Sequence, residues 1–190
     1  MTDERGGKAS TTWSRIARRI RVPLGFVFAA FYLWRARPSW ASLLTGTAIA
    51  LLGISLRAVA SGHVEKDRVL ATSGPYAYVR NPLYAGSIII GIGFTVAARD
   101  VWVLIAFVLL FVVVYIPVIR SEEAFLRGSF SEYGDYAQQV PSLLPRTLRF
   151  RQMTEGFSRE LYFSHREYNA LLGAAAVVGA LVVKILWFAG

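Results

Sequence analysis

Apolar runs separated by short polar segments dominate this 190-residue chain. The runs cover residues 22–34, 39–60, 83–98, 101–119 and 169–189. A helix needs about 20 predominantly apolar residues to cross a bilayer, and the second, fourth and fifth runs meet this length. The first run has thirteen residues, and flanking arginines that extend their charged ends to the interface would lengthen it. We therefore predict an all-α, polytopic membrane protein with about five transmembrane helices.

Composition supports a membrane protein and excludes several kinds of chemistry. Hydrophobic residues make up 55% of the chain, and the mean hydropathy is +0.44. Cysteine is absent, which excludes disulfides, thiolate catalysis and cysteine-based metal sites. The two histidines, His63 and His165, lie far apart in the sequence, so we expect no metal centre. The formal charge of +9 favours membrane loops beside anionic lipid over binding of nucleic acid.

The positions of Lys and Arg predict an orientation. If the spans alternate from a cytoplasmic N-terminus, 17 of the 21 basic residues fall in cytoplasmic segments. Cytoplasmic loops carry an excess of Lys and Arg, so this orientation is the favoured one. We expect one domain over 1–190 in a membrane, with a bacterial inner membrane as the predicted location. Residues 1–21 would form a tail and an interfacial helix, and 169–189 the last transmembrane helix.

The segment 74–86, between the second and third spans, is polar and rich in turn residues. Pro75 and Pro82 each push the preceding residue out of the helical conformation, and Pro82 suits the first turn of the third span. Irregular backbone at membrane depth is tolerated only where protein or a ligand satisfies its polar groups. The segment also contains three tyrosines, Tyr76, Tyr78 and Tyr84. These offer faces for an aromatic ring or a cation, or they act as anchors at the membrane interface.

An acidic pair, Glu122-Glu123, directly follows the fourth apolar run. Carboxylates close to lipid are costly and usually have a partner or a function. Arg120 lies three residues before Glu123, on the same face of a continued helix. The two residues form a local ion pair, or else Glu123 binds the ammonium or hydroxyl group of a ligand while Arg120 orients an anionic group. The predicted topology puts this pair on the same side of the membrane as 74–86, so we expect the two segments to meet.

Four short segments in this order resemble the isoprenylcysteine carboxyl methyltransferase family of membrane enzymes, which includes the phospholipid N-methyltransferases. They are Gly74-Pro75-Tyr76, Arg80-Asn81-Pro82-Leu83-Tyr84-Ala85-Gly86, Glu122-Glu123 and Val140-Pro141 with Leu144-Pro145. The resemblance covers about 60–146, which it implies is the cofactor-binding region. It implies an S-adenosylmethionine-dependent methyltransferase that releases S-adenosylhomocysteine, with a cofactor pocket on the cytosolic side. A lipophilic or lipid substrate would enter that pocket from the bilayer.

Residue roles follow from the same resemblance. The implied cofactor-binding residues are Leu70, Tyr76, Asn81, Pro82, Leu83, Tyr84 and Glu123. The implied catalytic residues are Arg80, Arg120 and Glu123, with Arg120 and Arg80 orienting the substrate. S-adenosylmethionine carries a sulfonium and no phosphate, so neither a glycine-rich phosphate loop nor a metal ion is expected.

Two positions depart from the family pattern. Asn81 stands where the family most often has His, and Phe130-Ser131-Glu132-Tyr133 lacks the family glycine. Asn forms hydrogen bonds but does not titrate near neutral pH. A carboxylate acceptor is already deprotonated at pH 7, whereas a protonated amine must first lose a proton, so Asn81 favours an O- or S-acceptor. The alternatives are a phospholipid amine N-methyltransferase, a membrane sterol-type reductase with a nicotinamide cofactor, and a scaffold without catalysis.

Overall fold

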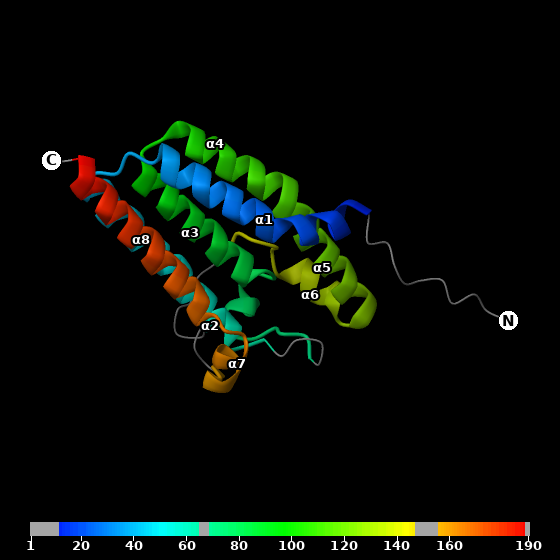
Figure 1. Cartoon of the computed structure of the whole chain (residues 1–190). Helices are drawn as coiled ribbons and strands as arrows, with labels where there is room; N and C mark the ends of the chain where they lie inside the picture. Colours follow the sequence, from blue (N-terminus) through cyan, green and yellow to red (C-terminus); the bar gives the residue numbers. More distant parts are fainter. Residues whose placement is uncertain (1–11, 65–68, 147–155, 189–190) are drawn as a thin grey trace.

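The computed structural model of the chain describes residues 12–64, 69–146 and 156–188, and every regular element in these ranges is helical (Figure 1). The predicted all-α class is therefore confirmed. The elements are α1 (Thr12–Arg35), α2 (Trp40–Ser61), the 3-10 turn η1 (Gly74–Ala77), α3 (Pro82–Ala98), α4 (Val101–Leu110), the π-helical turn η2 (Phe111–Tyr115), α5 (Ile116–Ser129), α6 (Tyr133–Gln139), α7 (Arg159–Ser164) and α8 (Tyr168–Phe188). The long helices lie side by side, and the short α6 and α7 lie at one end of the bundle (Figure 1).

Three helical stretches are long and apolar enough to cross a membrane, namely Trp40–Ser61, Val101–Ser129 and Tyr168–Trp187. Helix α3 is apolar but has only 17 residues. The apolar run 22–34 is the second half of α1, and residues 13–21 continue into it rather than forming a separate interfacial helix. No glycine or turn residue divides the two halves, and Pro23 removes one backbone hydrogen bond without ending the helix. The chain is an integral membrane protein with three candidate spans.

Small residues let α2 and α3 touch backbone to backbone. A Cβ atom added at Gly53 would lie 2.6 Å from the carbonyl oxygen of Gly86, and one added at Gly93 would lie 2.5 Å from that of Gly46. Small residues commonly allow such close approach between helices in membranes, where lipid gives no hydrophobic driving force for helix association. A Cβ at Gly86 would also lie 2.6 Å from Cγ of Arg57. The contact between α2 and α3 therefore places the Arg57 side chain across the start of α3.

One continuous helix of 29 residues runs from Val101 to Ser129, longer than the predicted 101–119. Pro117 lacks an N–H donor and its ring crowds the carbonyl four residues earlier. Just before it the helix widens into the π turn η2. The extra length carries Glu122 and Glu123 past the apolar part of the helix, to the end of the bundle where η1 lies (Figure 1).

The main apolar core lies at the opposite end of the bundle. Its buried members come from five helices and from the turn after α1, and they are Tyr32, Ala36, Leu43, Ala97, Ala98, Val103, Leu181 and Ile185. The Tyr32 hydroxyl donates a hydrogen bond to the carbonyl oxygen of Phe94 at 3.0 Å, which ties α1 to α3. This core fixes the helices at one end and leaves the polar residues to gather at the other.

Candidate functional site

Arg80 joins three segments at the polar end of the bundle. Its Nε donates to Oε1 of Glu123 at 3.2 Å and its Nη2 to Oε2 at 3.1 Å, which makes a two-point ion pair with α5. Its Nη1 donates to the carbonyl oxygens of Ala137 at 2.7 Å and Val140 at 2.8 Å, at the C-terminal end of α6. A planar guanidinium suits both the carboxylate and the last carbonyls of a helix. Burial lowers the pKa of Arg80, but the hydrogen bonds and charge of Glu123 raise the pKa above its usual value.

Asn81 belongs to the same network. Its side-chain amide donates to Oε1 of Glu123 at 2.6 Å and to Oγ of Ser142 at 3.1 Å, and the Ser142 hydroxyl donates to Glu123 Oε1 at 2.8 Å. The backbone amides of Arg80 and Asn81 donate to the carbonyl oxygens of Pro141 and Ser142 at 2.8 and 3.0 Å. The predicted meeting of the tyrosine-rich segment and the acidic pair is therefore confirmed, and the fourth motif segment, around Pro141, joins them.

The two carboxylates of the acidic pair have different surroundings. Four protein hydrogen bonds reach Glu123, three of them at Oε1. Glu122 accepts one hydrogen bond at Oε1, from the Tyr84 hydroxyl at 2.8 Å. A carboxylate offers about four lone-pair directions, so within the described residues Glu123 is satisfied and Glu122 keeps acceptor capacity. Glu123 holds the segments together, and Glu122 is the carboxylate with room for a ligand.

Aromatic rings stand beside Glu122. The ring of Tyr84 meets that of Tyr115 edge to face, with centroids 6.0 Å apart, and Tyr115 stacks on Phe111 at 5.6 Å. Phe111 and Tyr115 are the first and last residues of the π turn η2. Widened turns of this kind occur frequently at functional sites, because they re-aim side chains within a helix. Here the turn brings two aromatic rings to the start of α3.

Tyr76 and Tyr78 are each 8% exposed, so they are buried in the protein and do not anchor it in lipid. The Tyr76 carbonyl accepts a hydrogen bond from the Tyr136 hydroxyl at 2.7 Å, but its own hydroxyl has no hydrogen-bond partner among the described residues. Burial raises the pKa of Tyr76, the nearby charges of Glu167 and Glu122 raise it further, and Arg57 opposes them. The Tyr76 hydroxyl therefore stays protonated and faces these three charged side chains.

The backbone before Tyr76 needs glycine. Gly74 has φ +57, and a Cβ there would meet the ring of His63. The His63 Nδ1 atom lies 2.7 Å from the Val59 carbonyl oxygen, so the ring is fixed against the end of α2. Only glycine adopts this conformation without strain and leaves space for the ring. Gly74 thus sets the direction in which η1 presents Tyr76.

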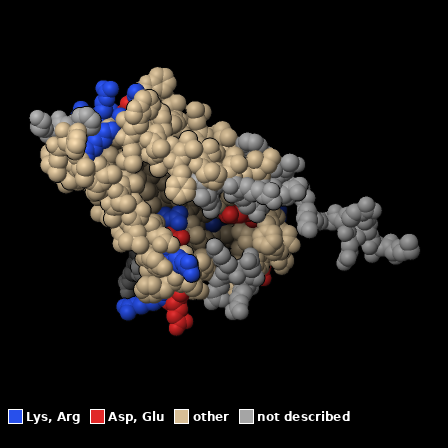
Figure 2. Space-filling view, viewed as in Figure 1, with Lys and Arg blue, Asp and Glu red and all other residues tan. Residues whose placement is uncertain are grey.

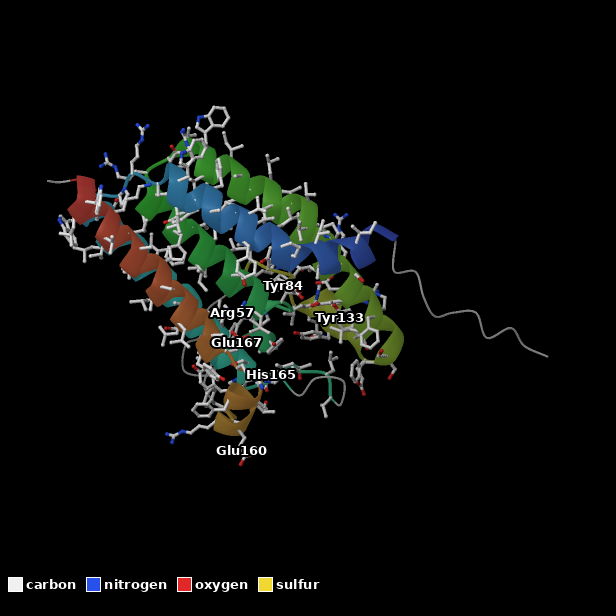
Figure 3. The ribbon with its side chains drawn as sticks, in the orientation of Figure 1. Arg57, Tyr84, Tyr133, Glu160, His165 and Glu167 are labelled. Atoms are coloured by element: carbon white, nitrogen blue, oxygen red, sulfur yellow. The ribbon has the colours of Figure 1, made fainter. Side chains whose placement is uncertain are left out.

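A second ion pair, between Arg57 of α2 and Glu167 at the start of α8, lies near Tyr76. The side chains of Arg57 and Glu167 are 23% and 12% exposed, and their closest atoms are 2.8 Å apart. Figure 3 shows the two side chains pointing toward each other, with Tyr84 close by. Figure 2 shows that the surface is hollowed at this place, with blue and red side chains at its floor. We refer to this feature as the hollow, and we assign to it Arg57, Tyr76, Tyr84, Glu122 and Glu167, which ion pairs, hydrogen bonds and nearby charges connect.

The remaining predicted site residues, Pro82, Leu83, Arg120 and Leu70, differ in how close they lie to this site. Pro82 is buried at the first position of α3, as predicted, and the Leu83 carbonyl oxygen accepts a hydrogen bond from Arg57 at 3.2 Å. Arg120 is exposed, and Glu123 pairs with Arg80 instead of with Arg120. Leu70 is half-buried in the extended stretch before η1. The roles of Arg120 and Leu70 stay predictions.

Sequence reasoning assigned no role to Ser142 or Glu167. Ser142 lies in a motif segment that was noted only for its prolines, and a hydroxyl there carries no periodic signal. Glu167 had a usable signal. Arg57 stands inside the second apolar run and requires a partner near lipid, and Glu167 precedes the last run on the same predicted side.

The fold and the site define an integral membrane protein with a polar, tyrosine-lined hollow at one end of its helices. Residues 40–133 match the family model described as phospholipid methyltransferase, and the chain belongs to this family of membrane proteins. This confirms the resemblance seen in the motifs. The matched range contains both carboxylates of the acidic pair and ends before Ser142 and Glu167.

Relatives in three organisms show how the chain compares with other proteins. It is 33% identical over 141 residues to the cobalt-zinc-cadmium resistance protein CzcN of Cupriavidus metallidurans. This alignment covers 69% of the present chain and 64% of CzcN. It is 33% identical over 119 residues to the nickel-cobalt-cadmium resistance protein NccN of Alcaligenes xylosoxydans, covering 58% and 54%. It is 32% identical over 103 residues to a protein-S-isoprenylcysteine O-methyltransferase of Schizosaccharomyces pombe, covering 54% and 44%. The matches thus span less than two thirds of these relatives, and no solved structure matches the chain.

Proposed function

We propose that this protein transfers a methyl group from S-adenosylmethionine to a lipophilic acceptor that resides in the membrane. The observation that carries the proposal is the hollow. The buried residue Tyr76, whose hydroxyl forms no hydrogen bond with the described residues, lies there with a carboxylate that accepts one hydrogen bond from them and with two aromatic rings, in a chain of the phospholipid methyltransferase family.

The chemistry of these residues fits the cofactor. S-adenosylmethionine presents a sulfonium cation, a flat adenine and polar groups that donate hydrogen bonds. Aromatic faces attract cations and stack on rings, which Tyr84 and Tyr115 provide. Glu122 accepts hydrogen bonds, and the protonated Tyr76 hydroxyl donates one. Of the predicted cofactor-binding residues, Tyr76, Pro82, Leu83 and Tyr84 would therefore line the cofactor, and the network of Asn81 and Glu123 would hold the segments that carry them.

The bound cofactor supplies an electrophilic methyl group, and methyl transfer mainly requires that donor and acceptor be aligned in a site without water. Arg80 fixes η1, α5 and α6 relative to one another, which makes the hollow rigid. Helix α4 exposes apolar side chains along its outer face, as a helix in contact with lipid does. A lipophilic acceptor would reach the hollow from the bilayer. In this proposal five helices cross the inner membrane, with the N-terminus and the hollow on the cytoplasmic side.

The acceptor class follows from Asn81 and Glu122. The Asn81 amide is committed as a donor to Glu123, so this residue positions and does not remove protons. An acceptor that is already deprotonated, such as a lipid carboxylate or a thiolate, needs no base and is our first candidate. A phospholipid amine is the second candidate, because Glu122 offers a carboxylate close to the hollow. Membrane extracts methylated with labelled S-adenosylmethionine separate a carboxylate acceptor from an amine, since methyl esters are cleaved by mild base and N-methyl groups are not.

Binding of S-adenosylhomocysteine to the detergent-purified protein, measured by calorimetry, tests the cofactor. Glu122→Gln should weaken binding about tenfold, since a hydrogen bond to a charged group is worth about 1.5 kcal/mol or more. The matched control Glu132→Gln, at an exposed position, should leave the affinity unchanged. If wild type binds NADPH instead, the sterol-type reductase is the better assignment. If it binds neither compound, the protein is a scaffold.

The two resistance relatives raise a second candidate function, a contribution to metal resistance. Within the described residues no group of three or more His, Cys, Asp or Glu is placed to hold a metal ion. We therefore frame this role as one that acts through methyl transfer. Deleting the gene and complementing it with wild type or Glu122→Gln tests the link. Resistance to cobalt or cadmium should return with wild type and not with the variant.

A further inference from the structure

Glu167 reaches the hollow from a part of the chain that the family match does not include. The matched range ends at residue 133, and Glu167 directly precedes α8. Arg57 donates to it through Nε at 3.0 Å and through Nη2 at 2.9 and 2.8 Å, engaging both carboxylate oxygens. The last helix is therefore connected to the site by a two-point ion pair.

The ion pair between Arg57 and Glu167 leaves part of the hydrogen-bonding capacity of Glu167 unused. The Nη1 of Arg57 donates to Oγ of Ser87 at 2.6 Å and to the Leu83 carbonyl oxygen at 3.2 Å, while Nε and Nη2 donate to Glu167. Glu167 accepts one hydrogen bond at Oε1 and two at Oε2. One acceptor direction at Oε1 remains, and the partnerless Tyr76 hydroxyl faces the same charges.

The position of Glu167 is held at both ends of α8. The helix packs along α2, and at its far end Lys184 Nζ donates to the carbonyl oxygens of Leu33 and Trp34 at the C-terminus of α1. A cation at helix-terminal carbonyls is stabilising. Figure 1 shows α8 lying along the bundle from the polar end to the opposite end. The helix thus holds the Glu167 carboxylate at the edge of the hollow.

We propose that Arg57 and Glu167 form the part of the cofactor site that takes the amino-acid end of S-adenosylmethionine, with Glu167 accepting a hydrogen bond from the α-ammonium group. The inference rests on the proposed function and names a binding residue outside the matched range. It follows from charge. Arg57, Glu122 and Glu167 sum to −1, and the cofactor, with a sulfonium, an ammonium and a carboxylate, sums to +1.

The amino-acid end is assigned to Glu167 and not to Glu122 because of their neighbours. Glu122 adjoins Tyr84, whose ring packs on Tyr115, which suits the sulfonium and the adenine. Among the residues that line the hollow, Glu167 is the carboxylate that adjoins a guanidinium. A carboxylate beside a cation matches the two opposite charges of an α-amino acid. Helix α8 therefore completes the cofactor site.

Two ligands test the inference, S-adenosylhomocysteine and 5′-methylthioadenosine, which lacks the amino-acid end. Their affinities for the full-length protein in detergent are measured by calorimetry for wild type and Glu167→Gln. Glu167→Gln should weaken S-adenosylhomocysteine about tenfold and leave 5′-methylthioadenosine within about twofold, because only the first ligand carries the ammonium. Asp100→Asn, in an ion pair at the opposite end of the bundle, is the matched control and should change neither affinity.

The remaining outcomes also decide the matter. Equal weakening of both ligands, or of neither, overturns the inference and makes the ion pair a structural one. If wild type binds neither ligand, the proposed function itself has failed. If Glu167→Gln does not fold, Glu167→Asp keeps the charge and shortens the reach. A selective loss of S-adenosylhomocysteine affinity in that variant supports the inference, and an unselective change overturns it.

Discussion

The two ends of the helix bundle both carry charged residues, but they use them differently. At the end where α1 finishes, Arg35 Nη2 lies 2.7 Å from Asp100 Oδ2, and Asp100 Oδ1 accepts the amides of Trp102 and Val103 at 2.9 and 3.1 Å. Lys184 donates to the last carbonyls of α1. Each charge there closes a helix end, which is an ordinary requirement of any helix terminus.

At the end that holds the hollow, the charged pairs are not confined to helix termini. Arg80 and Glu123 link η1, α5 and α6, and Arg57 and Glu167 link α2 with α8. The aromatic residues differ in the same way. Trp34 and Trp102 at the opposite end are 75% and 58% exposed, as interface anchors are, whereas Tyr76 is buried with its hydroxyl unpaired. Both ends contain a buried polar atom without a hydrogen-bond partner among the described residues, Arg35 Nε at the opposite end and the Tyr133 hydroxyl at the end with the hollow. The comparison shows that the ends differ in the position of their charged pairs, which reach beyond the helix termini only at the hollow.

The largest expected effect follows from removing Arg80. Arg80→Ala leaves Glu123 without its cation and frees the last carbonyls of α6, so we expect a loss of about 3 kcal/mol in the free energy of unfolding. Unfolding in mixed micelles with increasing SDS measures it. Arg120→Ala is the control, because Arg120 lies exposed on the same helix, and it should change stability by less than about 0.5 kcal/mol. Equal effects of the two variants would contradict the network described here.

A smaller loss is expected when the contact between α2 and α3 is widened. Gly86→Ala puts a methyl group against Cγ of Arg57 and the Gly53 backbone, so it should cost about 2 kcal/mol and also weaken S-adenosylhomocysteine binding. Gly128→Ala in α5 is the matched control. A Cβ there meets nothing within 4 Å, and the substitution should be neutral or stabilise by up to about 1 kcal/mol. If Gly86→Ala leaves the affinity for S-adenosylhomocysteine unchanged, Arg57 does not contribute to cofactor binding in the hollow.

The sequence predicted the helices and the meeting of its motifs because these depend on local signals. Apolar run length and Pro82 at the start of a helix each have a direct structural meaning. The choice of partners depends on tertiary contacts and was not predictable in the same way. One of the two alternatives for the acidic pair was an ion pair between Glu123 and Arg120, three residues away, but in the fold Glu123 pairs with Arg80. Whether a charged residue pairs with a neighbour in sequence or with a residue brought close by the fold cannot be predicted from the hydrophobic pattern.

An intermediate effect, confined to binding, is expected at Tyr76. Tyr76→Phe removes the unpaired hydroxyl, so S-adenosylhomocysteine should bind about fivefold more weakly, the equivalent of about 1 kcal/mol, while stability is unchanged or improved. Because the pKa of Tyr76 is raised, the wild-type hydroxyl stays protonated through pH 10, and affinity should not fall at the usual pKa of tyrosine. Tyr162→Phe in α7 is the control. If Tyr76→Phe lowers stability but not the affinity for S-adenosylhomocysteine, the Tyr76 hydroxyl has a structural role only.

The smallest effect is expected at the opposite end, where Asp100→Asn removes one ion pair and keeps a side chain that can still cap α4. Burial acts to raise the pKa of Asp100, but the hydrogen bond from Arg35 and those from the α4 amides outweigh it and hold the pKa below its usual value. A depressed pKa means that the aspartate stabilises the fold above about pH 4 and that this contribution is lost as the pH falls through the lowered pKa. The melting temperature of Asp100→Asn should therefore lie slightly below that of wild type at pH 7, and the two should converge under acidic conditions. Affinity for S-adenosylhomocysteine should be the same in both proteins, because charge at this end serves only the helix termini. A change in that affinity would mean that the two ends are coupled, and the division of roles between them would no longer hold.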